Sequence, residues 1–246
     1  MLALTIWRKV RDLAAWTANG LGFGGYSATD PRRKIMPAGM RPGRATANEL
    51  LTANLGGLRS YCRHLERNNP SARAAVEGLV ANVVGTGIAL EPDTGDKTAD
   101  KRLSVAWKDY LADCSAGGQD LYNLQGQAFR ETVTAGEFVW RLVVLPDRAE
   151  AGKIPLAVLP LESEWIEDVS LALSMPDAQG VTWVGGVGVD VYGRPVYYRL
   201  RNPEMTNAQA AETLPAAQII HEFERRRAMQ SRGEPWFAPV IETLQQ

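Results

Sequence analysis

The residues with the most capacity for chemistry form an acidic group around one tryptophan. Glu162, Glu164, Glu167 and Asp168 lie close to Trp165 in the sequence. Two carboxylates held near one another can act as general acid and base, or can bind Mg²⁺. This group raises the hypothesis of an uncharacterised hydrolase. We favour the alternative, in which the segment is a solvated acidic loop.

The chain offers few other catalytic groups. His64 and His221 are its two histidines. We assign no role to His64, and His221 falls in a predicted strand, which favours a core or strand-end position. There is no Gly-x-Ser-x-Gly elbow, P-loop or His-Glu-x-x-His motif. Gly85-Thr-Gly87 precedes a predicted strand, whereas a phosphate loop follows a strand and opens a helix, so we interpret it as structural.

The thiols and the basic residues have simple interpretations. Cys62 and Cys114 have no metal-ligand spacing, and we expect reduced, half-buried thiols of a cytosolic protein. Arg225–Arg227 and Arg232 are candidates for phosphate-backbone contacts or for salt bridges within or between subunits, and we favour salt bridges. The sequence therefore predicts no catalytic residue, no cofactor and no metal.

Composition is that of an ordinary globular protein, with 45% apolar and 22% charged residues among 246. The formal net charge of −1 disfavours tight general binding of nucleic acid. No stretch approaches the ~18 apolar residues of a membrane span. Charged residues interrupt the apolar N-terminus Met1–Trp16, which argues against a signal peptide. Trp7, Val10 and Ala14 indicate a helix that docks on a neighbouring surface or, alternatively, an interfacial membrane helix.

The most strongly marked element is a buried helix that begins after Asn69 and feeds a strand at Ile88–Leu90. Asn69 caps its first turn, and Pro70 occupies the first helical position. Gly85 closes the helix in the left-handed conformation. Gly78 indicates either close approach of another backbone or a tolerated defect. The face expected to be buried carries Ala72, Ala75, Val76, Leu79, Val80 and Val83.

A capping box from Thr46 to Glu49 opens the preceding helix. Gly56 and Gly57 interrupt this helix and are expected to bend it. Its apolar face carries Leu51, Leu55, Leu58, Cys62 and Leu65, and its polar face carries Arg59, Arg63, Glu66 and Arg67. The basic face is either a nucleic-acid contact or a solvated or subunit-facing surface, and we favour the latter.

The patterning changes from helical to extended at Gly136. A third helix bears Leu103, Ala106, Trp107, Tyr110 and Leu111 and ends at residues 116–118, and a fourth spans about Leu121–Ala135. Strands are predicted at Glu137–Leu145, Ile154–Leu161, Val181–Val189, Arg194–Leu200 and Gln218–Phe223, with a turn at 146–152 and a hairpin at 190–193. Two prolines place the second strand at an edge. The fold class is therefore α+β, with N-terminal helices packed on a mostly antiparallel sheet of short strands.

Two regions are predicted. Residues 1–45 comprise an N-terminal helix and an extended arm rich in glycine and proline, which is either tied down by a partner or a flexible tether. Residues 46–246 form the α+β domain. A helix begins near Pro239 and the sequence stops within about two turns, so we expect the natural protein to continue.

A series of short motifs runs in order along nearly the whole chain. These motifs are Gly25-Tyr26, Leu58-Arg59 to Leu65, Arg67-Asn-Asn-Pro70, Asn82-Val-Val-Gly-Thr-Gly-Ile88, Gly136-Glu137-Phe138, Gly186-Val187 to Asp190, Gly193-Arg194, Tyr197-Tyr198, Pro215-Ala216, Ile220-His221 and Arg232-Gly-Glu-Pro-Trp-Phe-Ala-Pro-Val-Ile241. In these motifs the chain resembles the lambda-family portal proteins of tailed bacteriophages.

The resemblance implies a structural subunit of the virion, assembled in the bacterial cytoplasm. It implies a homo-oligomeric ring, typically of twelve subunits, at one capsid vertex. The channel of such a ring passes double-stranded DNA without sequence specificity during packaging and ejection. Terminase docks there first and head–tail joining proteins follow. The resemblance implies no catalysis, no cofactor and no membrane. A conduit for sliding DNA must not hold phosphates tightly, and the near-neutral charge is compatible with that role.

The departure from this family is length. Family members continue into channel-lining stem helices and a motor-docking clip, so the resemblance implies that this chain holds the arm and much of the outer wing. Closed rings need both faces of a heterologous interface, so assembly by this chain alone stays open. The alternatives are another phage or prophage head-assembly module and the hydrolase described above.

Overall fold

The computed structural model describes residues 45–88, 91–167, 180–201 and 211–244. The chain divides into two units, Met1–Arg44 and Ala45–Gln246. The description below concerns the second unit. The predicted N-terminal helix and arm lie outside the described residues.

The helices follow local signals in the sequence. They are α2 (Ala47–Asn68), α3 (Pro70–Val83), α4 (Lys97–Ala112), α5 (Leu121–Ala135), α6 (Pro146–Glu150) and α7 (Ile241–Leu244). The capping box at the start of α2 is confirmed, because Thr46 and Glu49 bond each other's backbone reciprocally. Asn69 ends α2 by donating its N–H to the Leu65 carbonyl, and its side chain accepts from the first turn of α3. Gly56 and Gly57 do not interrupt α2.

The outer helices are more exposed than the sequence predicted. In α3 only Ala72 and Val76 are buried, while Leu79 is 36% and Val83 is 61% exposed. Gly85 has the predicted positive φ of 53°. Gly78 faces open space, so the tolerated-defect interpretation holds. Ile88 lies in no strand, and Ala89 and Leu90 fall outside the described residues.

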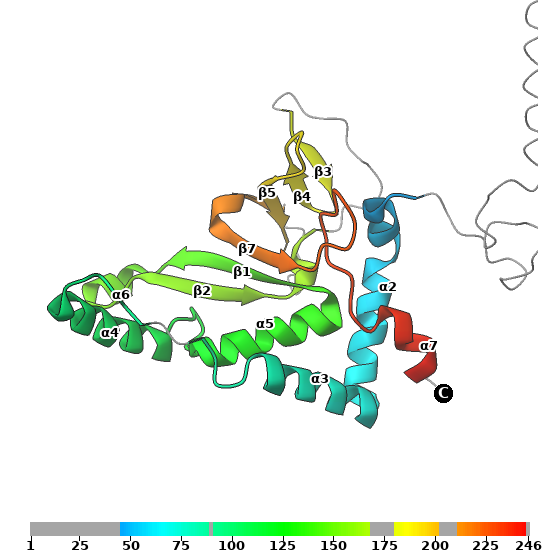
Figure 1. Ribbon diagram of the computed structural model, residues 1–246. Helices are drawn as coiled ribbons and strands as arrows, with labels where there is room; N and C mark the ends of the chain where they lie inside the picture. Colours follow the sequence, from blue (N-terminus) through cyan, green and yellow to red (C-terminus); the bar gives the residue numbers. More distant parts are fainter. Residues whose placement is uncertain (1–44, 89–90, 168–179, 202–210, 245–246) are drawn as a thin grey trace, which may run out of the picture. The chain divides into compact units, whose positions relative to one another are not determined.

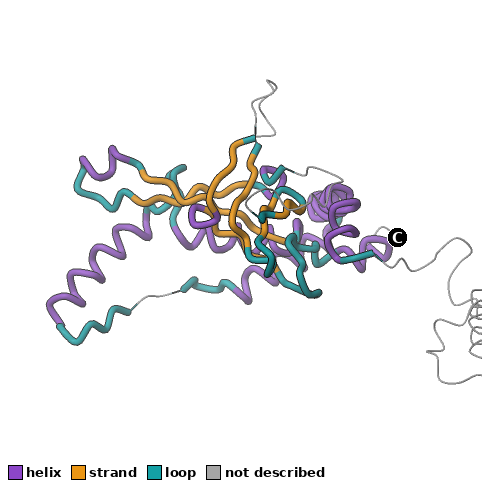
Figure 2. The backbone as a smooth tube through the Cα atoms, turned by 90° about the horizontal axis from the view of Figure 1, so that it is seen from above, coloured by secondary structure: helices purple, strands orange, loops and turns teal. Residues whose placement is uncertain are grey.

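Helix α4 also differs from its prediction. It ends at Ala112, before the predicted glycines, and none of its residues is buried. Together with α6 it occupies the end of the unit that lies away from α2 and α7 (Figures 1 and 2). The α6 helix takes up most of the predicted turn at 146–152.

The strands form two antiparallel sheets. The first has the order β2-β1-β7, built from β1 (Glu137–Val144), β2 (Leu156–Leu161) and β7 (Ile219–Phe223). The second has the order β3-β4-β5-β6, built from β3 (Thr182–Val184), β4 (Val187–Val189), β5 (Pro195–Leu200) and β6 (Glu212–Pro215). Short 3₁₀ helices are η2 (Ser163–Trp165), η3 (Ala216–Gln218) and η4 (Ala238–Val240).

The α+β prediction is confirmed, with two corrections in the sheets. The predicted strand Val181–Val189 is two strands, because Gly185 and Gly186 adopt φ values of 51° and 80° and turn the chain between β3 and β4. Strand β6 was not predicted. The edge position of β2 is confirmed, and Pro160 lies opposite Trp140 of the central strand β1.

The first sheet is covered on both faces. Helix α5 runs along one face (Figure 1), where Leu124 packs with Val158, Trp140 and Leu142. On the other face Val139 joins the core shared with the second sheet. A third apolar cluster joins α2, α3 and α5 to the C-terminal segment through Phe237 and other side chains. Among the described residues, no helix is long and apolar enough to cross a membrane.

Candidate functional site

The predicted acidic group does not form a site. Glu164 pairs with Arg63 of α2, with 2.6 Å between its Oε1 and the guanidinium Nη1. Glu167 instead pairs with Arg199 and Arg201 at β5 and just beyond it. Asp168 lies outside the described residues. No group of three or more potential metal ligands occurs in the described part of the chain.

A different carboxylate is buried and bonded to several distant segments of the chain. Glu137, the first residue of β1, is fully buried. Its Oε1 lies 2.5 Å from Arg59 Nη2 and 2.6 Å from Arg232 Nη2. Its Oε2 accepts from His221 Nε2 at 3.1 Å and from the Gly233 N–H at 2.6 Å. These residues together with Tyr198 are called the Glu137 cluster below.

The cluster keeps Glu137 ionised. Burial alone would raise the pKa of its carboxyl group, but Arg232, Arg59 and His221 together hold that pKa well below its ordinary value. Burial lowers the pKa of Arg59, against the attraction of Glu137. Two buried guanidiniums around one carboxylate satisfy its lone pairs with charge-assisted hydrogen bonds.

His221 extends the cluster toward the second sheet. Its Nε2 faces the carboxylate and therefore carries a proton, so in the neutral ring Nδ1 accepts from the Tyr198 hydroxyl at 3.2 Å. Burial, and then the charge of Glu137, raises the pKa of Tyr198, which stays a neutral donor. The prediction of a core position for His221 is confirmed, since 1% of its side chain is exposed.

Arg232 fastens the segment Met229–Trp236, called the strap below, to three elements. Besides Glu137, it donates to the Gly185 carbonyl in the β3–β4 turn at 2.5 Å and to the Ser163 carbonyl of η2 at 3.1 Å. At the next residue, Gly233, an added Cβ would lie 2.0 Å from the Gly136 carbonyl oxygen, so only glycine fits. The strap thus passes against the turn between α5 and β1.

The geometry of the cluster excludes catalysis at Glu137. The side chains of Arg59, Arg232 and His221 are 5%, 3% and 1% exposed, and Glu137 is fully covered. Each charged atom of the carboxylate already has protein partners. A substrate has no access to these groups, and the cluster instead joins α2, both sheets and the strap.

The sequence patterns did not indicate this cluster. The predicted position of Arg59 on the polar face of α2 is wrong, because Arg59 is buried. A signal was present: Arg59 follows Leu55 by four residues and precedes Cys62 by three, so it borders the apolar stripe. The preference for Arg232 as a salt bridge is confirmed.

The other predicted site residues are dispersed. Arg226 pairs with Glu224 and Glu234, Arg227 donates to the Ala45 carbonyl, and Arg225 lies over the Phe223 ring. His64 bonds Asn68 on the surface of α2. Cys62 and Cys114 are free thiols but fully buried, so the half-buried expectation is wrong. Gly87 approaches the Tyr122 ring and leaves no room for a side chain.

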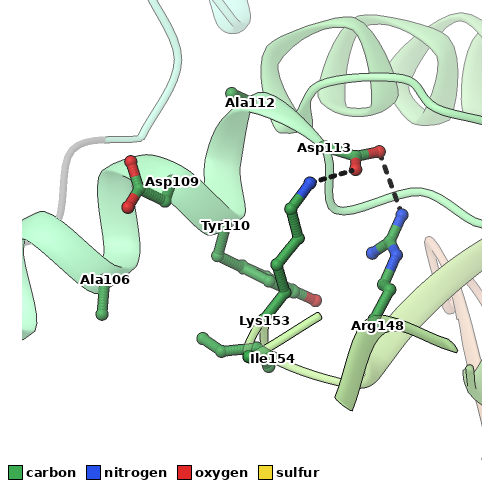
Figure 3. A pocket seen from close by; sticks show the side chains of 9 residues that line it. Ala106, Asp109, Tyr110, Ala112, Asp113, Arg148, Lys153 and Ile154 are labelled. Atoms are coloured by element: carbon green, nitrogen blue, oxygen red, sulfur yellow. Dashed lines mark hydrogen bonds and ion pairs between the residues drawn. The ribbon is translucent and has the colours of Figure 1, made fainter. Parts of the chain in front are cut away.

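A cavity of about 420 Å³ opens between α4 and the end of the β1–β2 hairpin. Figure 3 shows Asp113 between Lys153 and Arg148, at 3.7 Å and 3.0 Å respectively. Asp113 is thus engaged by both cations, and Asp109 also lines the cavity. Tyr110 lines it, and burial raises the pKa of this phenol.

These observations describe an interior cluster of charged side chains that joins distant segments of the fold. The chain belongs to the lambda family of phage portal proteins, whose sequence profile matches residues 34–246. This is a family of structural proteins without enzymatic activity, so the hydrolase hypothesis is wrong. No curated protein matches the chain.

Proposed function

We propose that the chain is a subunit of the portal ring at a capsid vertex, in the virion. The ring conducts double-stranded DNA during packaging and ejection, and it docks terminase and the head–tail joining proteins. The observation that carries this proposal is the family match over residues 34–246. The formal net charge of −1 supports passage of DNA without tight binding to phosphates.

The internal architecture fits a rigid wall segment of the ring. The Glu137 cluster ties α2, the first sheet, the β3–β4 turn and the strap into one unit. Exposed apolar side chains lie instead on the outer helices, for example Val83 and Val105. In the proposed ring these side chains are available for contacts with neighbouring chains.

Electron microscopy of the protein expressed from its complete reading frame tests the proposal. The expected result is rings with a central hole, each built from several identical subunits. Particles that remain monomeric at all protein concentrations, and that fail to form rings when mixed with capsid protein, would contradict it. If ring formation depended on a short DNA duplex of one particular sequence, the proposal that the channel passes DNA without sequence specificity would be contradicted.

A further inference from the structure

A groove of about 260 Å³ runs along the first half of α2. One wall is apolar and includes Leu50, Leu51 and Leu58. The other wall comes from the segment before and within the strap and includes Arg226, Arg227 and Glu234. The groove lies on the surface and is separate from the enclosed Glu137 cluster.

A patch of exposed apolar side chains adjoins this groove. Val191 and Tyr192 are 73% and 77% exposed at the tip of the β4–β5 hairpin, and Met229 is 59% exposed. Met229 lies against Gly193 of that hairpin, and its carbonyl accepts from Asn48 Nδ2 of α2 at 2.8 Å. The patch therefore connects the hairpin tip to the groove.

The hairpin tip is held in one conformation. Asp190 Oδ1 accepts from the N–H groups of Tyr192 and Arg194 at 2.8 Å and 2.9 Å. A tyrosine on a fixed turn loses little conformational freedom on binding. Aromatic residues and methionine are enriched in protein–protein interfaces. These features indicate a surface for a protein partner.

The charge around the groove favours an acidic partner. Of the two arginines that line the groove, Arg227 has no carboxylate partner among the described residues, whereas Arg226 has Glu224 and Glu234. Arg227 is held at the start of α2 by the Ala45 carbonyl. The acidic residue of that first turn, Glu49, is engaged in the capping box. The groove edge thus offers the guanidinium of Arg227 to a partner's carboxylate.

We propose that this groove binds an amphipathic helix of a partner protein. Its apolar side chains would lie against Leu50, Met229 and Tyr192, and a carboxylate at its edge would face Arg227. An apolar helix face in an apolar groove with charged residues at the edge is a recurring mode of recognition. This inference goes beyond the ring and channel proposed above and does not depend on them.

A designed peptide tests the proposal in the full chain. The probe is a fluorescent helical peptide of about 18 residues, with leucines on one face and glutamates at its edges. Its matched control has lysines in place of the glutamates. Fluorescence anisotropy is expected to show at least about tenfold tighter binding of the acidic peptide.

Two variants and one control locate the binding site. Leu50→Ser is expected to weaken binding of the acidic peptide about tenfold. Arg227→Glu is expected to reverse the preference between the two peptides. The control is Leu103→Ser on α4, because Leu103 is 48% exposed and Leu50 is 45% exposed. This control is expected to leave both affinities unchanged.

Three outcomes overturn the proposal. One is the absence of binding by the acidic peptide at millimolar concentration, and another is equal binding of both peptides. The third is self-association of the chain, measured by sedimentation, that Leu50→Ser abolishes while no peptide binds. That result would assign the face to a second copy of the chain.

Discussion

The Glu137 cluster and the outer helices distribute their side chains in opposite ways. In the cluster, charged groups are enclosed: Glu137 is fully buried and Arg59 and Arg232 are nearly so. In α3 and α4, apolar groups are exposed, with Val83 at 61% and Val105 at 57%. The cluster thus reverses the usual partition of charge outside and apolar surface inside, whereas the outer helices expose apolar side chains together with charged ones.

The difference separates the contacts that form within the unit from the side chains that remain exposed on it. Buried ion pairs repay their desolvation only when every partner is present, so the cluster forms only when α2, β1, β7 and the strap meet in one arrangement. The outer helices make no comparable demand on the rest of the unit. Their exposed apolar side chains are available to another chain, as in the proposed ring.

Removal of the central carboxylate is the strongest test of this contrast. Glu137→Gln leaves two buried guanidiniums without a counter-charge, and we expect a loss of about 3–5 kcal/mol in the free energy of unfolding. Urea unfolding at neutral pH measures it. The matched control is Glu212→Gln, which removes an exposed partner of Arg141 and should change stability by less than about 1 kcal/mol. Equal losses in the two variants would show that the Glu137 cluster contributes no more to the free energy of unfolding than an exposed ion pair does.

A smaller effect is expected where the strap touches the α5–β1 turn. In Gly233→Ala the new Cβ would meet the Gly136 carbonyl oxygen at 2.0 Å, so the backbone must shift. We expect a loss of about 2–3 kcal/mol, measured by thermal unfolding. Gly78→Ala in the outer helix α3 is the control, because its Cβ faces open space. That control should stabilise the protein by up to about 1 kcal/mol.

Cys62 of α2 gives the next effect, which depends on pH. Burial raises the pKa of this thiol to about 11. Because the folded pKa lies above the unfolded one, the stabilisation is complete below about pH 8.5 and is lost as the pH rises toward the folded value. The loss is on the order of 2 kcal/mol. Unfolding of the protein and of Cys62→Ala at about pH 8 and about pH 10 measures it. An unchanged difference between the two proteins at both pH values would contradict the burial argument.

The elements that the sequence predicted were those specified by neighbouring residues. The capping box at Thr46, the Asn69 cap and the end of α5 at Gly136 were all correct. Each involves hydrogen bonds or a backbone conformation within a few residues, which a local pattern can contain. The split of β3 from β4 was missed, although Gly185-Gly186 is a local signal.

The Glu137 cluster was not predictable in this way. Arg59, Glu137 and Arg232 come from distant parts of the chain, and no spacing between them indicates a contact. The burial of α3 was overestimated for a related reason. An apolar stripe shows which face of a helix can be covered, but whether it is covered depends on neighbours such as α5, or on another chain.

The smallest expected effect tests whether α3 contributes little to the free energy of unfolding. Asn69 Oδ1 accepts from the N–H groups of Ser71 and Ala72 at 2.9 Å and 3.1 Å. Asn69→Ala should reduce the free energy of unfolding by about 1 kcal/mol, the ordinary value of a lost cap. Asn82→Ala on the same helix is the control, because among the described residues this side chain bonds only the Gly78 carbonyl of its own helix, and we expect almost no change. A loss at Asn69 comparable to that in Glu137→Gln would mean that α3 supports the centre of the unit. The outer helix α3 would then not be weakly coupled to the enclosed Glu137 cluster, and the contrast drawn between the two regions would be wrong for α3.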